Sequence, residues 1–142
     1  MKTSLNTIDR LRSSGLRPTK QRIAIVDYLF NREKTFHFTV EDIQKNLKTK
    51  SNQKISLATF YNTINTLKKF GHLKEIKTND NKSYFDTNIK SHHHFYDEKQ
   101  NLLTDIDYDS VELKKIPSLP SGKKLKNIEV TIKVENDRKS TR

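Results

Sequence analysis

The sequence predicts an α+β protein built from two parts, and three observations support this fold class. Apolar residues recur at helical spacing through residues 1–70, and short runs of alternating polarity follow them. Residues 1–86 hold 17 basic and 8 acidic residues, whereas residues 87–142 hold 11 and 9. A basic first part and a nearly neutral second part indicate a polyanion-binding module joined to a different module. A lysine-rich proteome would also give such a charge, so charge alone leaves the partner open.

The first part begins with a series of predicted helices. SLNTIDRLRSSG favours a short helix that ends at Gly15. A second helix follows, and Pro18 suits its first turn. Its apolar face consists of Ile23, Val26, Leu29 and Phe30. A third helix begins at the capping-box-like stretch from Thr39 to Asp42. The apolar residues of this third helix are Val40, Ile43 and Leu47.

SLATFYNTINTLKKFG predicts the last helix of the first part, with Ser56 as N-cap and Gly71 as its stop. Its apolar stripe consists of Leu57, Phe60, Ile64 and Leu67, and the residues off that stripe are Tyr61, Asn62, Asn65 and Lys69. HLKEIKT and SYFD then predict two short strands around a polar turn. Helices followed by such a hairpin have the order of a winged helix-turn-helix domain, which we expect over residues 1–86.

Nucleic-acid recognition fits the last helix, because a helix in the major groove needs an apolar back and short polar or aromatic groups in front. The candidates for contact with base edges are Thr59, Tyr61 and Asn62. The candidates for contact with phosphates or a minor groove are Arg17, Lys20 and Arg22. Two alternatives stay open: Tyr61 as a half-buried core aromatic, and a winged helix that binds protein instead of DNA.

The second part opens with a cluster of histidines. HHFYDEK and LLTDID predict a hairpin across Gln100 and Asn101, in which His92 and His94 face one way and His93 the other. Carboxylates flank this pair: Asp86 lies six residues before His92, and Asp105 lies on the returning strand. Two imidazoles and two carboxylates suit Fe(II), Mn(II) or Zn(II). The alternative is a solvated polar strand without a metal.

Several classes of protein are excluded or disfavoured. The chain has no cysteine, which removes disulfides, thiolate nucleophiles and Cys-based zinc sites. No apolar run approaches the length of a membrane span, and MKTSLNTIDR lacks an apolar signal core, so we expect a cytoplasmic protein. A metal-dependent hydrolase is disfavoured because no further base accompanies the histidines and aspartates, so the protein is not expected to be an enzyme.

These motifs resemble the ferric uptake regulator (Fur) family of bacterial metal-responsive transcription factors, from about residue 10 to residue 134. GLRPTKQR is similar to the family's entry into its second helix, and SLATFYNTI to its recognition helix with Tyr61. YFDTNIKSHHHFYDEKQNLLTDI and NIEVTIKV resemble the central motif and the closing strand of the iron response regulator branch, Irr, which responds to haem.

The resemblance implies a regulatory metal site formed by His37, Asp86, His92, His94 and Asp105. It adds His37 to the four residues that the pattern itself indicates. A second family site would include His93 and Glu112, but Ser91 occupies a third position and no histidine follows Glu112, so that site is expected to be incomplete. Asp97 and Gln100 stand where the first cysteine pair of the family's structural zinc would be, so that zinc is expected to be absent.

The resemblance also implies the second domain and its function. Residues 87–134 should form a small antiparallel α/β dimerisation domain closed by a strand at about 126–134, and residues 135–142 a disordered tail. Pro117, Pro120 and Gly122 should shorten or break the long helix of many relatives. A dimer is expected because about 50 residues form a poor core alone and symmetric operators need two recognition helices.

The expected protein is a metal- or haem-responsive repressor of iron homeostasis that binds an AT-rich operator as a dimer. Without cysteine, His93 is the expected haem ligand, with Phe95 on its side of the strand, and haem-synthesis machinery is a possible partner. The alternative function is a constitutive nucleic-acid-binding or ribosome-associated protein in which the histidine run is incidental.

Overall fold

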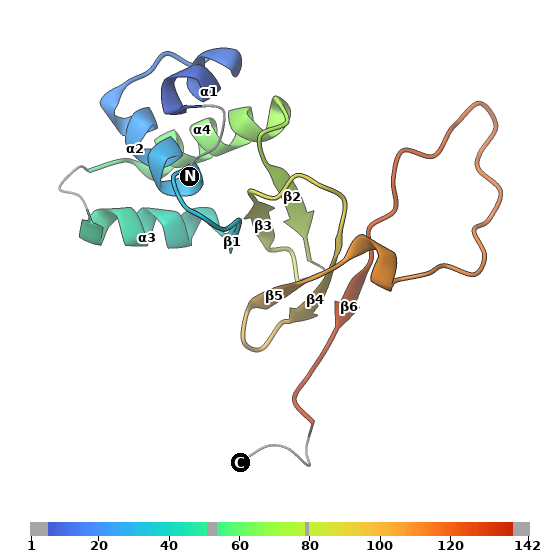
Figure 1. The fold of residues 1–142 in the computed structure, drawn as a ribbon. Helices are drawn as coiled ribbons and strands as arrows, with labels where there is room; N and C mark the ends of the chain where they lie inside the picture. Colours follow the sequence, from blue (N-terminus) through green and yellow to red (C-terminus); the bar gives the residue numbers. More distant parts are fainter. Residues whose placement is uncertain (1–5, 51–53, 79, 138–142) are drawn as a thin grey trace. The chain divides into compact units, whose positions relative to one another are not determined.

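The computed structural model describes residues 6–50, 54–78 and 80–137 (Figure 1). The chain divides into two compact units, Met1–Ile89 and Lys90–Arg142. The described residues of the first unit form four helices and a three-stranded sheet, and those of the second form another three-stranded sheet. Helices and antiparallel strand pairs together confirm the predicted α+β fold class. None of the helices in the described ranges is both long and apolar enough to span a bilayer.

The helices of the first unit are α1 (Thr7–Ser13), α2 (Lys20–Phe30), α3 (Val40–Lys50) and α4 (Leu57–Lys69). Each begins after a side-chain oxygen that accepts a hydrogen bond from a backbone N–H three residues further on. These N-cap residues are Asn6, Thr19, Thr39 and Ser56. Pro18 lies directly before the Thr19 cap, not in the first turn of α2 as expected. Its fixed φ suits the extended approach to the cap equally well.

One hydrophobic core holds these helices together. Its buried members are Leu11, Ile25, Val26, Leu29, Phe38, Val40, Ile43, Leu47, Ile55, Phe60, Ile64, Leu67, Leu73 and Phe85. Within α4 the buried positions include Phe60, Ile64 and Leu67, as predicted. Leu57 differs, because it is 38% exposed in the first turn of α4. Thr63 is fully buried, at a position where the sequence predicts no core residue.

The sheet of the first unit forms the wing. It consists of β1 (His37–Phe38), β2 (Lys74–Lys77) and β3 (Ser83–Asp86), in the order β1-β3-β2 with antiparallel neighbours. The backbone of Thr78 donates to the carbonyl of Lys82 and closes the β2–β3 turn. The register pairs His37 with Asp86, so this sheet carries a histidine and a carboxylate side by side.

Replacing Ser56 with Ala should lower the free energy of unfolding by about 1 kcal/mol, because the Ser56 Oγ accepts from the backbone N–H of Thr59 at 3.1 Å and starts α4. Chemical denaturation with circular dichroism measures this loss. Ser118→Ala is the matched control, since Ser118 is exposed in an irregular segment. An equal change in both variants would show that the cap contributes nothing.

The second unit contains β4 (His93–Asp97), β5 (Leu102–Ile106) and β6 (Thr131–Lys133), in the order β5-β4-β6. The β4–β5 hairpin is antiparallel, as predicted. The last strand lies within the predicted range but runs parallel to β4, so the sheet is mixed. A parallel neighbour needs a long connection, and the chain supplies one in the wide loop that leads to β6 (Figure 1).

That connection contains one short 3-10 helix, η1 (Tyr108–Ser110), and residues 111–130 are irregular. The described part of the second unit therefore has no α-helix, which differs from the expected α/β composition. Pro117 and Pro120 interrupt the segment, and Gly122 has a φ of 77° that ends any helical path. The broken helix was predicted from these residues.

The tip of the β4–β5 hairpin is held by polar side chains. The Asp97 Oδ1 accepts from the backbone N–H groups of Lys99 at 3.0 Å and Gln100 at 3.2 Å. The Gln100 side chain donates to the Asn136 Oδ1 at 3.3 Å, which ties the tip to the segment after β6. Of the predicted tail at 135–142, residues 135–137 are irregular and the last five positions lie outside the described residues.

Candidate metal centre

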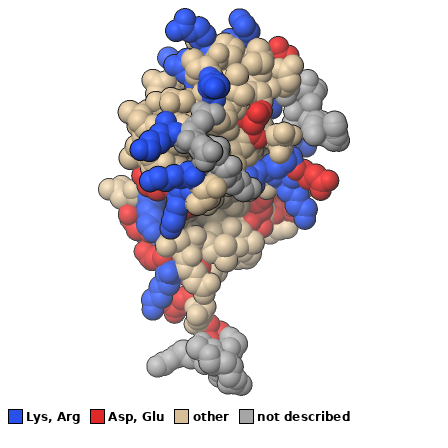
Figure 2. All heavy atoms as spheres, turned by 90° about the vertical axis from the view of Figure 1, so that its left-hand side faces the viewer, with Lys and Arg blue, Asp and Glu red and all other residues tan. Residues whose placement is uncertain are grey.

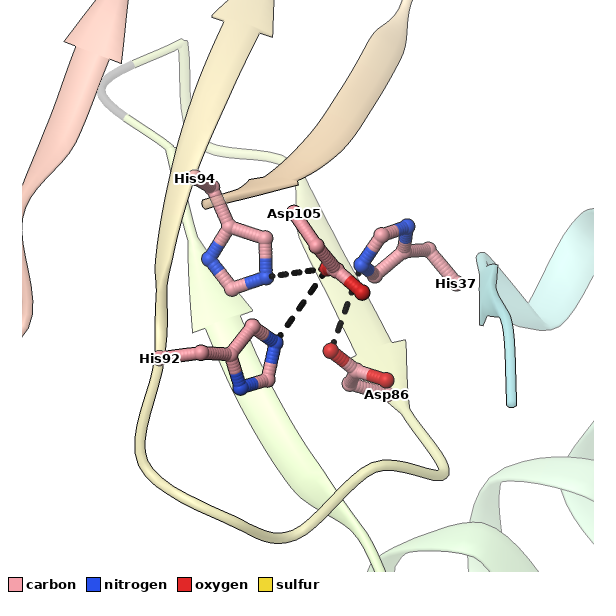
Figure 3. Close-up of side chains that lie close together, drawn as sticks. All are labelled: His37, Asp86, His92, His94 and Asp105. Carbon is pink, nitrogen blue, oxygen red and sulfur yellow. Dashed lines mark ion pairs between the residues drawn. The ribbon is translucent and has the colours of Figure 1, made fainter. Parts of the chain in front are cut away.

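In the first unit, the wing positions one imidazole and one carboxylate. The His37 Nε2 lies 3.2 Å from the Asp86 Oδ2, and Figure 3 draws this pair. Cross-strand pairing of β1 with β3 places them together. The Asp86 side chain is almost fully buried, and its other oxygen accepts from the backbone N–H of Asn88 at 2.9 Å. The carboxylate is thereby oriented toward His37.

In the second unit, β4 and β5 bring together two imidazoles and one carboxylate (Figure 3). The Nε2 atoms of His92 and His94 lie 3.2 Å and 3.3 Å from the same oxygen of Asp105. Strand register explains the His94 contact, because His94 is paired directly with Asp105. His92 lies immediately before β4, two residues from His94, and its ring lies beside that of His94 (Figure 3). Both rings are buried, with centroids 4.4 Å apart, whereas the Asp105 side chain is 46% exposed.

The tautomer of His92 is fixed by the backbone. Its Nδ1–H donates to the carbonyl of Lys90 at 2.6 Å, so the neutral ring presents a lone pair at Nε2. That lone pair faces the Asp105 carboxylate oxygen, an unfavourable arrangement that a proton or a metal ion between the two atoms relieves. A ligand histidine whose other nitrogen donates to a carbonyl is the usual arrangement in metal sites.

The separations also fit a metal. Nitrogen and oxygen ligands lie about 2.0–2.2 Å from a zinc-sized ion, which puts tetrahedral neighbours about 3.3 Å apart. The two imidazole–carboxylate distances in the second unit are close to this value. The candidate ligand atoms of His92, His94 and Asp105 all lie within 4.8 Å of one another. These three residues therefore have the chemistry and the spacing to ligate one divalent ion.

His93 points to the other face of β4, as alternation predicts, and its contacts are structural. Its ring is buried and stacks on Tyr108, with centroids 5.0 Å apart and an interplanar angle of 17°. Its Nδ1 accepts from the backbone N–H of Val130 at 2.9 Å, so the neutral ring carries its proton on Nε2. Neither nitrogen of this tautomer presents a lone pair to an iron atom. The contacts therefore favour a structural role over ligation.

The predicted second metal site gains no support from the geometry. Glu112 is exposed in the irregular segment after η1. Within residues 6–50, 54–78 and 80–137, the candidate metal-ligand group includes neither Glu112 nor His93. Phe95, two residues after His93 on β4, is 39% exposed.

The predicted base-contacting residues lie on the outer side of α4. Tyr61 and Asn62 are exposed and Thr59 is half-buried. The Tyr61 hydroxyl donates to the Glu41 Oε2 on α3 at 2.6 Å. This hydrogen bond is the main cause that raises the pKa of Tyr61, with smaller contributions from burial and from the Glu41 charge. Tyr61 is therefore not an ordinary core aromatic, but a neutral hydroxyl held at the surface.

The predicted phosphate-contacting residues surround the start of α2. Arg17 and Lys20 are exposed, and the Arg22 guanidinium donates to the carbonyl of Arg17 at 3.0 Å, which orders this basic stretch. Lys and Arg side chains predominate over acidic ones on the helical side that Figure 2 presents. This surface has the charge that binds a polyanion.

Sequence reasoning missed two residues at these sites. Glu41 lies 20 residues before Tyr61, and a glutamate in the first turn of a helix is explained locally by capping, so no signal linked the two. The Lys90 carbonyl is a backbone group, which the sequence does not mark. Both act by orienting a residue that the sequence did indicate.

Comparison with known proteins places these features in context. The sequence model of the Ferric uptake regulator family matches residues 13–133. The peroxide-responsive repressor PerR of Staphylococcus epidermidis is 36% identical over 106 residues, 75% of this chain and 69% of that protein. PerR of Staphylococcus aureus is 35% identical over 102 residues, 72% of this chain and 67% of that protein.

Two solved structures share the fold. The ferric uptake regulator of Vibrio cholerae has a TM-score of 0.70 at 19% identity, covering 92% of this chain and all (100%) of that chain. The ferric uptake regulator of Pseudomonas aeruginosa, determined with manganese, has a TM-score of 0.68 at 19% identity and covers 93% and 98% of the two chains. The relatives that carry the sequence similarity are named PerR, so the resemblance to the Irr branch is not confirmed.

Proposed function

Because the chain belongs to the ferric uptake regulator family, whose members are transcription regulators and not enzymes, we propose that it is a cytoplasmic repressor whose affinity for operator DNA depends on a bound divalent metal. The observation that carries this proposal is the group of His92, His94 and Asp105, with two buried imidazoles aimed at one carboxylate oxygen. Fe(II), Mn(II) or Zn(II) suits these donors.

We propose further that His37 and Asp86 complete the site. Three ligands from one unit leave a divalent ion short of the four or more that it usually takes in proteins. The first unit carries a second imidazole–carboxylate pair at the end of its wing. Asp86 and His92 are separated by only five residues, a span of about 20 Å at most when extended, so the two groups stay neighbours along the chain. An ion shared between them would fix the angle between the two units, which is how it would control DNA binding.

The proposed DNA contacts use the residues on the outer side of the helices. Thr59, Tyr61 and Asn62 would reach base edges of an AT-rich inverted repeat. The basic stretch formed by Arg17, Lys20 and Arg22 would contact phosphates or the adjacent minor groove.

The active species is proposed to be a homodimer formed by the second unit. Phe95, Leu102 and Ile132 share one face of the β5-β4-β6 sheet according to the strand register, and each is 39% to 53% exposed. Exposed apolar residues on one sheet face favour burial against a second copy. A dimer would also present two recognition helices to a symmetric operator.

The proposal also concerns the chemical signal that changes the affinity of the protein for DNA. Iron availability is one candidate signal, because Fe(II) is among the ions that suit the donor set, and the names of the relatives favour peroxide as a second candidate signal. Bound Fe(II) would supply a centre that peroxide can oxidise, whereas Mn(II) resists such oxidation. Haem sensing at His93 is the weakest candidate, because the ring is stacked on Tyr108 and its Nδ1 accepts from the Val130 N–H.

Operator-binding titrations test the proposal. We expect apo protein to bind an AT-rich inverted-repeat duplex weakly and Mn(II)- or Fe(II)-loaded protein to bind it more tightly. Hydrogen peroxide should release DNA from the Fe(II)-loaded protein and leave the Mn(II)-loaded protein bound if peroxide is the signal. Equal affinity of the apo and loaded proteins would instead support a constitutive nucleic-acid-binding protein. Haem, added in a further titration, should leave the affinity for the operator unchanged.

A further inference from the structure

A second cationic site lies in the first unit, apart from the residues assigned to metal or DNA. It is a pocket of about 280 Å³ near the end of α2. The lining residues that matter for its chemistry are Arg10, Phe30, Arg32, Glu33, Lys34 and His72. Three cations against one carboxylate give this lining a net charge of +2 while His72 is neutral.

Arg10 is the unusual member of this lining. Its side chain is only 9% exposed, and among the described residues it forms no ion pair with a carboxylate. One guanidinium nitrogen, Nη1, lies 3.0 Å from the His72 Nδ1, and the buried Nε–H has no partner in the described parts of the chain. The guanidinium lies over the Phe30 ring at 3.8 Å, which compensates part of the burial. A buried arginine normally has an anionic partner, because its desolvation is costly.

His72 is held neutral by its contacts. Its Nδ1 accepts from Arg10, its Nε2–H donates to the Ser13 Oγ at 3.2 Å, and that hydroxyl donates to the Arg10 carbonyl at 3.1 Å. Burial and the adjacent Arg10 charge lower the pKa of His72. The imidazole therefore orients the guanidinium without supplying the negative charge that it lacks.

Arg32 and Lys34, the other two cations of the pocket, do not supply a negative charge either. The Arg32 side chain donates to the Tyr28 carbonyl through Nε at 3.3 Å and through Nη2 at 3.1 Å, and it lies over the Phe36 ring at 3.5 Å. Neither contact is with an acid. Lys34 is exposed on the adjacent loop. Guanidinium groups bind carboxylate and phosphate oxygens through paired N–H donors, so the chemistry of the pocket selects an oxyanion.

We propose that this pocket binds a small dianionic oxyanion, a phosphate or a dicarboxylate, which contacts the Arg10 guanidinium and is held between Arg32 and Lys34. The charge of such a ligand matches the net charge of the lining. The ligand joins α1, the end of α2 and the loop after it, and so stabilises the first unit.

Titration of the full-length protein with inorganic phosphate, and in a second arm with succinate, tests the proposal against sodium chloride at equal ionic strength. We expect a saturable rise in the melting temperature and a shift of the Arg10 Nε–H resonance with at least one of the two anions. Arg10→Gln should weaken that anion's binding by at least about tenfold, since it removes a charged donor. Arg12→Gln, on the same helix but exposed, should leave it unchanged.

Lys34→Gln is a second test of the pocket. Because Lys34 is exposed, this substitution does not disturb the buried core. Lys34→Gln should weaken anion binding without lowering the stability of the anion-free protein. Lys45→Gln, an equal change of charge on α3, is the control and should leave anion binding unchanged. Saturation by phosphate but not succinate would identify a phosphate site, and the reverse a carboxylate site. The proposal is overturned if neither anion binds saturably, or if Arg10→Gln and Lys34→Gln bind as tightly as their controls.

Discussion

Replacing His94 with Asn should lower the affinity for Mn(II) by at least about 100-fold. Loss of a partner outside the direct ligands already costs about 10–100-fold in metal affinity, so loss of a direct ligand should cost more. Asn can occupy the position of the imidazole Nδ1 but cannot reach that of Nε2, the atom 3.3 Å from the Asp105 oxygen. Competition with a chelator of known affinity measures the change.

His93→Asn is the matched control, since it makes the same substitution one residue earlier on the opposite face of β4. Its amide oxygen can still accept from the Val130 N–H in place of Nδ1. We expect the Mn(II) affinity of this variant to stay near that of the unchanged protein. A similar loss in both variants would mean that the effect is structural and that the ligand assignment is wrong.

His37→Asn tests the contribution of the first unit. If the ion is shared between the units, this variant should lose both Mn(II) affinity and metal-dependent operator binding. Retention of full Mn(II) affinity would confine the site to His92, His94 and Asp105, and a link between metal and operator binding would then need another explanation.

Replacing Tyr61 with Ala should lower the affinity for the specific operator by about 1–3 kcal/mol and leave binding to random DNA nearly unchanged. Tyr61 is exposed on α4, and its ring is held by the hydrogen bond from its hydroxyl to Glu41. A preoriented ring can contact a base edge or a thymine methyl with little loss of conformational freedom. Electrophoretic or fluorescence titrations on both kinds of DNA measure the difference.

Arg17→Ala provides the contrast, because a phosphate contact carries no sequence information. It should weaken binding to specific and random DNA alike and reduce the dependence of affinity on salt concentration. Equal losses on both kinds of DNA for Tyr61→Ala would remove Tyr61 from base readout. The Glu41 contact would then be a structural tie between α3 and α4.

Much of the fold was predictable from local patterns. The caps at Thr39 and Ser56 and the apolar spacing in α4 are properties of neighbouring residues, and the structure has them where the sequence predicts them. Leu57 shows the limit of periodicity: it continues the stripe in sequence, but in the first turn of α4 it lies beyond the core. The parallel pairing of β6 was also not predictable, because strand direction depends on a connection without regular structure.

The sequence by itself determined the opposite faces of His92 and His93, since side chains alternate along any strand. It also indicated Asp86, His92, His94 and Asp105 as candidate ligands, because these residue types stand at spacings that strands bring together. The tertiary structure decided what each side chain contacts: His92 Nδ1 is taken by the Lys90 carbonyl, His93 Nδ1 by the Val130 N–H, and the Tyr61 hydroxyl by Glu41. It also buried Arg10 beside His72, which lies 62 residues away. Such contacts join groups that are distant in the chain or belong to the backbone, and no local pattern of side chains encodes them.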